Sequence, residues 1–294
     1  GRAYDWYNVG KLRNSGFEFD LNVKLIQKKD WYWDMSVNGY TYANKMLNLP
    51  DEYKVSGMPN GNQRIYEGKD IYRWEMRQFA GLDEKGNSLW YMDQDILDDA
   101  GNVVGVEKVT TGDATEATQY LLEKSALPDF TGGLNTTLRW KSLDLTIMTN
   151  FQFGGYGYDY DFSAFSSANF PMNRLKNYAD AWNPETGKGS APIWNTNDSN
   201  INASSDRFLI SKTYFNLRNI TLGYTFPANW MSKIGIKSVR VYFACDNVFF
   251  ASKRKGYDPR TSMGGQGATV ALNSVDGTYY SPIRTTSVGL NINF

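Results

Sequence analysis

The sequence has no histidine, a single cysteine and no excess of charge of either sign among its 294 residues. Without histidine, imidazole general bases, His-based catalytic triads and most zinc or copper sites are excluded. Cys245 alone can form neither an internal disulfide nor a thiolate metal cluster. Because 31 basic residues balance 31 acidic ones, there is no electrostatic reason to expect a nucleic-acid partner.

Long hydrophobic runs are also missing, since no apolar stretch approaches the roughly 18 residues that a membrane helix needs. What the chain has instead is aromatic residues: 20 Tyr, 16 Phe and 9 Trp. So many aromatics in a polar chain suit β-strands whose two faces meet different solvents. The first residues, Gly1–Trp6, show neither a start Met nor a signal peptide, so we expect a processed chain or a piece of a longer one.

Apolar and polar residues alternate along many segments. In Phe17–Leu25 one face is apolar and the other is polar or charged, and in Leu143–Phe153 the alternation lasts 11 residues, about what a tilted strand needs to cross a bilayer. The apolar residues of Phe215–Phe226 change phase, which predicts a bulge near Arg218 or Asn219. The same pattern predicts strands in Trp31–Tyr42, Ile71–Phe79, Leu134–Trp140, Val239–Phe249 and Thr286–Phe294.

The connections between these segments alternate in length. Short ones, such as 27–30, 83–87 and 141–142, are followed by long ones, such as 44–63, 94–130, 154–212 and 250–281. Bacterial outer-membrane β-barrels are built in this way, with short periplasmic turns and long extracellular loops. Aromatics near the strand ends fit interfacial girdles, namely Trp31, Trp33, Trp74, Trp90, Trp140, Phe151, Phe153, Phe226 and Phe249.

A soluble, secreted β-sandwich that binds glycans is the alternative, because its strands also alternate apolar and polar positions. A sandwich buries its apolar faces against each other, rarely needs strands of 11 residues, and does not need long loops at one end only. The pattern therefore favours a barrel. A passive porin is a third alternative, which would require a complete closed barrel and no plug.

Two short segments are distinctive: LRNITLGYTFP at 217–227 and KGYDP at 255–259. With the stretches around them, they resemble the C-terminal part of the barrel of SusC/RagA-like TonB-dependent outer-membrane transporters. The matching stretches, which together run almost from end to end, are Asn8–Leu21, Ala80–Tyr91, Leu127–Gly155, Ser204–Pro227, Val239–Arg260 and Ser281–Phe294.

The resemblance implies a barrel of roughly 22 strands. Family members also have an N-terminal plug, a TonB box and a signal peptide. The sequence pattern predicts about nine or ten strands, the tenth being residues 3–9, which are too few to close such a barrel. We therefore expect residues 1–294 to be a C-terminal barrel segment from which plug, TonB box and signal peptide are absent. The aromatic last residue, Phe294, resembles the signal read by the barrel assembly machinery.

The implied function is import rather than catalysis. The resemblance implies TonB-dependent uptake of oligosaccharides (glycans) or peptides across the outer membrane, together with a SusD-like surface lipoprotein. TonB–ExbB–ExbD would act through the plug, lipid would surround the barrel, and the C-terminus would lie on the periplasmic side. The charged strand residues expected to face the lumen are Glu18, Asp20, Arg73, Glu75, Arg77, Arg139, Asp144, Arg240 and Asp246.

A Gly- and Tyr-rich stretch at 154–162 could line a glycan path, because aromatic faces stack on sugar rings and acidic side chains bind hydroxyls. The favoured alternative is an aromatic loop that packs on itself. Helical spacing at 171–183 predicts a short helix, more suited to loop packing than to binding. The candidate substrate-binding residues are Tyr156, Tyr158, Asp159, Tyr160, Trp182 and Trp194.

An acidic segment containing Asp93, Asp95, Asp98 and Asp99 is a weak candidate for a structural Ca²⁺ site, because that ion prefers clustered oxygen ligands. The spacing does not match an EF-hand, so a solvated extracellular loop is the favoured interpretation. No cofactor, catalytic residue or other metal site is expected.

Overall fold

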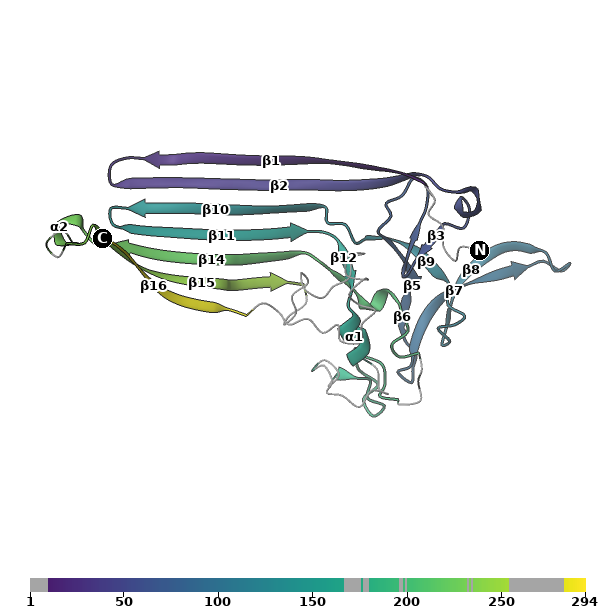
Figure 1. Cartoon of the computed structure of the whole chain (residues 1–294). Helices are drawn as coiled ribbons and strands as arrows, with labels where there is room; N and C mark the ends of the chain where they lie inside the picture. Colours follow the sequence, from purple (N-terminus) through teal and green to yellow (C-terminus); the bar gives the residue numbers. More distant parts are fainter. Residues whose placement is uncertain are drawn as a thin grey trace, which may run out of the picture.

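The computed structural model describes residues 10–166, 176, 180–195, 198, 200–231, 233, 235–253 and 283–294. Its main element is one antiparallel sheet of seven strands, the wall sheet (Figure 1). In spatial order its strands are β1 (Lys11–Gln27), β2 (Trp31–Asn48), β10 (Phe130–Trp140), β11 (Leu143–Phe153), β14 (Tyr214–Thr225), β15 (Ser238–Ser252) and β16 (Thr285–Asn293). The expectation of an antiparallel all-β wall is confirmed.

The connections at the two ends of the wall sheet differ in size. At one end residues 28–30 and 141–142 make tight turns, and residues 226–237 hold the short helix α2 (Ala228–Met231). Lys141 takes the left-handed conformation, φ 51°, that a two-residue hairpin turn requires. At the other end residues 49–129 and 154–213 form large excursions, which we call the loop module (Figure 1). The alternation of short and long connections is therefore confirmed for these connections, whereas the long one expected at 250–281 lies mostly outside the described residues.

The strand count of the wall was overestimated from the sequence. Among the described residues seven strands pair in it, rather than nine or ten. The segment expected at Ile71–Phe79 is β5 (Arg73–Arg77). The strand implied between the connections 83–87 and 94–130 is β7 (Ser88–Leu97), and both belong to smaller sheets of the loop module. Alternation shows that a strand has two unlike faces, but not which sheet it joins. The tenth strand, in residues 3–9, lies outside the described residues.

Three small sheets are found in the described part of the loop module. A four-stranded sheet has β3 (Met58–Asn60), β4 (Gln63–Ile65), β5 and β9 (Gln119–Ser125); a three-stranded sheet has β6 (Phe79–Leu82), β7 and β8 (Val103–Thr111); and β12 (Tyr156–Tyr158) pairs with β13 (Leu209–Ser211). The short helices of its described part are η1 (Asp51–Tyr53), α1 (Tyr160–Phe165) and η3 (Asp206–Phe208). None of the described helices is long and apolar enough to span a membrane.

Small hydrophobic cores hold the loop module together. The largest contains Trp74, Met76, Leu122 and Phe208, and a second forms around Trp90. Trp74 and Trp90 are 4% and 2% exposed. Both were expected in interfacial girdles, and that expectation is wrong because their strands are not in the wall.

The wall sheet has one apolar face that none of the described residues covers. Phe17 is 67% exposed, Phe243 46% and Val288 77%. In a β-sandwich this face would lie under a second sheet, so the sandwich alternative does not describe the fold. Register shifts on both sides of β14, with Arg218 left out of both ladders, confirm the predicted bulge.

Aromatic side chains form a band at each end of the apolar face. Near the loop module, Phe19, Phe130 and Phe151 lie in a row across three strands, with ring centroids 6.4 and 6.1 Å apart. The ring of Phe130 lies over Gly39, where any side chain would collide with it. At the opposite end Trp31 stacks on Trp140 at 5.6 Å. The two bands fit the girdles expected from the sequence.

Candidate functional site

A polar pocket of about 690 Å³ lies where the wall sheet meets the loop module; we call it the junction pocket. Its charged side chains are of both signs and balance: Lys45, Lys69, Arg73, Asp70, Glu123 and Asp129. The rest of its lining comes from Thr41–Asn44, Gly68, Ser125, Leu127, Pro128, Gly155 and Tyr156. The end of β2 thus meets three segments of the loop module, at 68–73, 123–129 and 155–156.

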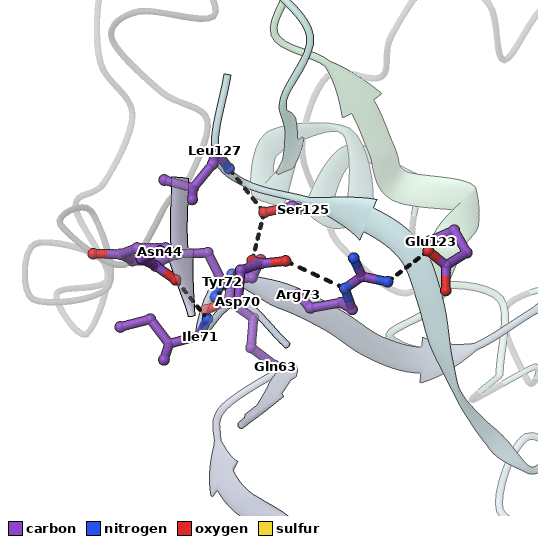
Figure 2. Close-up of polar contacts among 9 residues, drawn as sticks. All are labelled: Asn44, Gln63, Asp70, Ile71, Tyr72, Arg73, Glu123, Ser125 and Leu127. Atoms are coloured by element: carbon purple, nitrogen blue, oxygen red, sulfur yellow. Dashed lines mark hydrogen bonds and ion pairs between the residues drawn. The ribbon is translucent and has the colours of Figure 1, made fainter. Parts of the chain in front are cut away.

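Asp70 is hydrogen-bonded to several of the segments that line the pocket (Figure 2). Its Oδ1 accepts hydrogen bonds from the Tyr72 backbone N–H at 3.1 Å and from the Ser125 hydroxyl at 2.7 Å. The Ser125 oxygen in turn accepts from the Leu127 N–H at 3.1 Å. This chain of bonds ties β5, β9 and the start of the return to the wall into one unit.

Arg73 bridges two carboxylates. Its Nε lies 3.3 Å from Asp70 and its Nη1 lies 2.6 Å from Glu123 (Figure 2). Burial opposes the charged form of Arg73, but the hydrogen bonds to Glu123 and Asp70 outweigh it and raise the pKa of the guanidinium. The hydrogen bond from Arg73 lowers the pKa of the Glu123 carboxyl. The contact therefore favours the charged forms of both Arg73 and Glu123.

Asn44 supplies a buried amide on the β2 side. Its Oδ1 accepts from the Ile71 N–H at 3.0 Å, and the residue is only 7% exposed. Its Nδ2 has no hydrogen-bond partner among the described residues. A buried donor without a partner is costly, so this amide is a candidate hydrogen-bond donor toward the pocket that Asn44 lines.

The opposite side of the pocket is lined by Tyr156, one of the candidates named from sequence. The ammonium of Lys124 lies 5.5 Å from the centre of its ring, and its backbone carbonyl accepts from Trp74 Nε1 at 3.1 Å. Close by, Lys212 donates to the Ala126 carbonyl at 3.4 Å, and burial lowers the pKa of this lysine.

Two other candidates from the same stretch are buried. Tyr158 is 3% exposed within the largest core, and Asp159 is fully buried and caps α1 by accepting from the Phe162 N–H at 2.8 Å. Neither side chain can contact a substrate in this conformation, so that part of the prediction is corrected in favour of the packed aromatic loop. Tyr160 packs edge-on against Tyr158, with ring centroids 4.6 Å apart.

The tryptophan candidates lie elsewhere in the loop module. The ring of Trp182 lies against Gly86, and its backbone N–H bonds the Ala191 carbonyl at 2.8 Å. Trp194 is 47% exposed. The predicted helix at 171–183 falls mostly outside the described residues. The structure does not gather the six candidates into one site.

The charged residues expected on the lumen side fall into two groups. Six of them share the polar face of the wall sheet: Glu18, Asp20, Arg139, Asp144, Arg240 and Asp246. The other three, Arg73, Glu75 and Arg77, belong to β5 in the loop module and are corrected accordingly. Glu75 is 9% exposed and pairs with Arg64 at 2.6 Å.

Polar contacts run across the strands of this face. Arg240 reaches Asp144 with two bonds of 3.0 and 2.5 Å, passing over Gly223, where any side chain would collide with the guanidinium. Asn219 donates to Asp246 at 2.8 Å. These contacts link β11, β14 and β15 on the face opposite to the exposed apolar residues.

The acidic segment is a strand and a turn rather than a loop. Asp93 and Asp95 lie in β7, and Asp98 closes the turn that follows by accepting from the backbone N–H groups of Ala100 and Asn102. Among the described residues no three acidic, cysteine or histidine side chains are grouped so as to hold a metal ion. Asp93, Asp95, Asp98 and Asp99 therefore do not form such a group in the described part of the chain.

Sequence reasoning missed Asn44, Asp70, Ser125 and Glu123. Only Asp70 carries a local signal, because an Asp that bonds the N–H two residues later makes an Asx-turn. Asn44, Glu123 and Ser125 lie 26 to 55 positions away from Asp70 in the chain, so no local pattern could have placed them in the same pocket.

The fold and the site together define a class of protein. It has a barrel-wall sheet with an exposed apolar face of the kind that contacts lipid, and a folded module at one end of that sheet. No family model matches the chain. It is 25% identical over 308 residues to the TonB-dependent receptor P3 of Formosa agariphila, covering 98% of this chain and 29% of that protein. It is 26% identical over 294 residues to the TonB-dependent receptor SusC of Bacteroides thetaiotaomicron, covering 98% of this chain and 27% of that one.

Comparison with solved structures gives the same result as comparison with sequences. The RagAB peptide transporter matches with a TM-score of 0.73 at 26% identity, and the RagAB peptide importer in its closed-closed state with 0.74 at 26%; each comparison covers 98% of this chain and 30% of the other. The chain is thus a homologue of the SusC-like TonB-dependent receptors, which are not enzymes, as its motifs indicated. It spans less than a third of the length of these relatives.

Proposed function

We propose that this chain forms part of the wall and rim of an outer-membrane β-barrel that imports nutrients by a TonB-dependent route. The observation that carries the proposal is the wall sheet, whose uncovered apolar face is bounded by two aromatic bands. Such a face is stable against lipid and unstable in water. The names of the relatives support the TonB-dependent route.

The opposite face suits a water-filled lumen or a plug. Strand β11 has 11 residues, enough to cross a bilayer at a tilt. Charged residues such as Asp144 and Arg240 can be accommodated on the polar face of the wall sheet, because they pair with each other and face a polar medium. In this orientation the loop module is extracellular, Phe294 lies at the periplasmic rim, and that residue serves as the assembly signal.

The substrate class is oligosaccharides or peptides, taken up together with a SusD-like lipoprotein that covers the extracellular mouth. TonB–ExbB–ExbD would act through a plug that lies outside these 294 residues. The junction pocket supports either substrate, because paired charges suit peptide groups and the amide of Asn44 suits hydroxyls or carbonyls. Similarity to a protein described as a peptide transporter favours peptides.

The test is uptake by cells that carry the complete transporter gene or its deletion. Labelled oligosaccharides and labelled peptides would be offered separately to the wild type, the deletion strain, a strain without TonB and a strain without the lipoprotein gene beside the transporter gene. We expect uptake of one class to be lost in the first two mutants and reduced in the third. Uptake that persists without TonB would identify a passive pore instead, and unchanged uptake in the deletion strain would overturn the proposal.

A further inference from the structure

The hairpin formed by β7 and β8 projects from the loop module, away from the wall sheet (Figure 1). Strand β6 pairs only with the first residues of β7, as far as Trp90, and β8 pairs only with β7. Beyond that point the hairpin is a ribbon of two strands without a third strand on either edge, among the residues that the structure describes. A ribbon of this kind is marginally stable in water on its own.

Aliphatic side chains concentrate at the end of this ribbon, which we call the hairpin tip (Asp95–Val106). Its five large aliphatics are each 45–63% exposed: Ile96, Leu97, Val103, Val104 and Val106. Unlike the apolar residues of the wall, they lie beyond the end of the sheet and outside the two aromatic bands. Exposed aliphatics on an open strand edge favour association, so natural proteins usually cover or charge them.

Side-chain contacts connect the base of the hairpin to the rest of the loop module. The ammonium of Lys108 lies 4.4 and 4.3 Å from the ring centres of Tyr91 and Tyr120 and donates to Gln78 Oε1 at 2.6 Å. The Tyr120 hydroxyl donates to Asp93 at 2.6 Å. Burial, together with that carboxylate, raises the pKa of Tyr120 to about 12, so the Tyr120 hydroxyl keeps its proton at physiological pH and remains a donor to Asp93. These contacts join the base of the hairpin to β9 and to the residue between β5 and β6.

The charge of the tip indicates what covers it. It contains Asp95, Asp98 and Asp99 and no Lys or Arg, and Glu107 follows it directly. The nearest cation along the hairpin, Lys108, is held between two tyrosines. An apolar patch with an uncompensated acidic rim is complementary to an apolar patch ringed by lysine or arginine.

We propose that the hairpin tip is a docking element for the SusD-like lipoprotein, and that it inserts its aliphatic side chains into an apolar patch ringed by basic residues on that protein. This inference rests on the proposed function, which supplies the partner. The acidic rim steers the encounter, and the aliphatic side chains provide the affinity.

The experiment measures binding of the purified lipoprotein, without its lipid anchor, to the complete transporter immobilised in detergent. In the tip variant Leu97→Ser/Val104→Ser we expect the Kd to rise by about tenfold or more, as for truncated interface anchors. The matched control is Val55→Ser, which changes the same kind of side chain at a position 93% exposed elsewhere in the loop module; its Kd should stay within about twofold.

A second variant, Asp95→Asn/Asp99→Asn, tests the charge rim without removing an aliphatic. It should slow association at low salt and flatten the dependence of the association rate on ionic strength, because screening acts on the charges that steer the encounter. This variant also keeps the proposal testable if the serine variant fails to assemble.

The outcomes separate this inference from the proposed function. If the wild-type transporter does not bind the lipoprotein, the proposed partnership itself fails. If the wild type binds and both tip variants bind equally well and with the same salt dependence, only the docking role is overturned. If the tip variants instead abolish association between two transporters, measured by light scattering, the tip pairs with a second copy of the chain and this proposal is wrong.

Discussion

The wall sheet and the loop module are parts of one chain that follow opposite rules of burial. Among the described residues, the buried hydrophobic side chains lie almost entirely in the loop module, and only Met46 and Cys245 belong to wall strands. The wall instead carries most of the exposed large hydrophobics, such as Phe17 and Val288. A module that buries its apolar side chains can fold in water, whereas the wall needs an apolar solvent to be stable.

The largest effect expected from a single substitution is in the core of the loop module. Phe208 is 1% exposed and packs edge-on against Tyr158 and Phe162. Phe208→Ala should destabilise the module by about 3–5 kcal/mol through lost contacts and a cavity, while the wall still assembles. Limited proteolysis of the assembled transporter would show this as new cleavage within residues 154–213.

The matched control is Phe249→Ala, which removes the same ring from a wall position that is 53% exposed. It should leave the protease resistance of the loop module unchanged. If Phe208→Ala instead abolished assembly of the wall, the two regions would not fold by separate rules.

A charged residue on the apolar face of the wall sheet should have the next largest effect. Leu145 lies on the apolar face of β11, and Leu145→Arg should cost about 2–4 kcal/mol near the bilayer midplane. The amount of transporter in the outer-membrane fraction should fall. Thr146→Arg, one residue further on the polar face, should be tolerated; equal levels of the two variants would contradict the assigned orientation of the sheet.

A smaller effect is expected from the ion pair on the polar face. Arg240 and Asp144 are 29% and 20% exposed, so Asp144→Asn should cost only about 1 kcal/mol. The urea midpoint of the detergent-solubilised transporter would measure it. Gly223→Ala should have a similar effect, because the added methyl group displaces the guanidinium. If the losses of stability caused by the two substitutions were fully additive in the double variant, the substitutions would not act on the same contact.

The smallest effect concerns pH at the hairpin tip. Hydrogen bonds, first of all from the Asn102 backbone, lower the pKa of the Asp98 carboxyl from its usual value of 3.8. A carboxyl whose pKa is depressed on folding stabilises the turn above the unfolded pKa, and this contribution is lost as the pH falls through the folded pKa. Amide hydrogen exchange at Ala100 and Asn102, corrected for intrinsic rates, should lose protection below about pH 4. Asp98→Asn should remove this pH dependence.

The sequence predicted the elements of the wall well because each wall strand carries its own evidence. The alternation in Leu143–Phe153 identified β11 with both bounds. The phase change in Phe215–Phe226 predicted a bulge near Arg218 or Asn219, and the structure has it at Arg218. It failed at Ile71–Phe79, because Trp74 and Met76 alternate with charged residues just as wall residues do. A strand in a small soluble sheet and a strand in a barrel differ in their neighbours, which local patterning does not encode.

The candidate site depends on the same kind of distant contact. Tyr156, a substrate-binding candidate from the sequence, lines the junction pocket, but Tyr158, two positions away on the same strand, is buried in the core. Composition marks a Tyr- and Gly-rich stretch without saying which ring faces a cavity. Packing against Phe208, 50 positions further along the chain, decides that.

By itself the sequence determined that this chain is an antiparallel β protein of two-faced strands, without histidine or cysteine chemistry, and akin to the SusC-like receptors. These properties follow from composition, local periodicity and short motifs, which need no knowledge of distant contacts. Tertiary structure alone decided which strands form the wall, that Asn44, Asp70, Arg73 and Ser125 meet in one pocket, and that an acidic segment ends in a projecting apolar tip. Each of these depends on pairings between residues far apart in the chain, and such pairings are settled by packing and solvent rather than by local sequence.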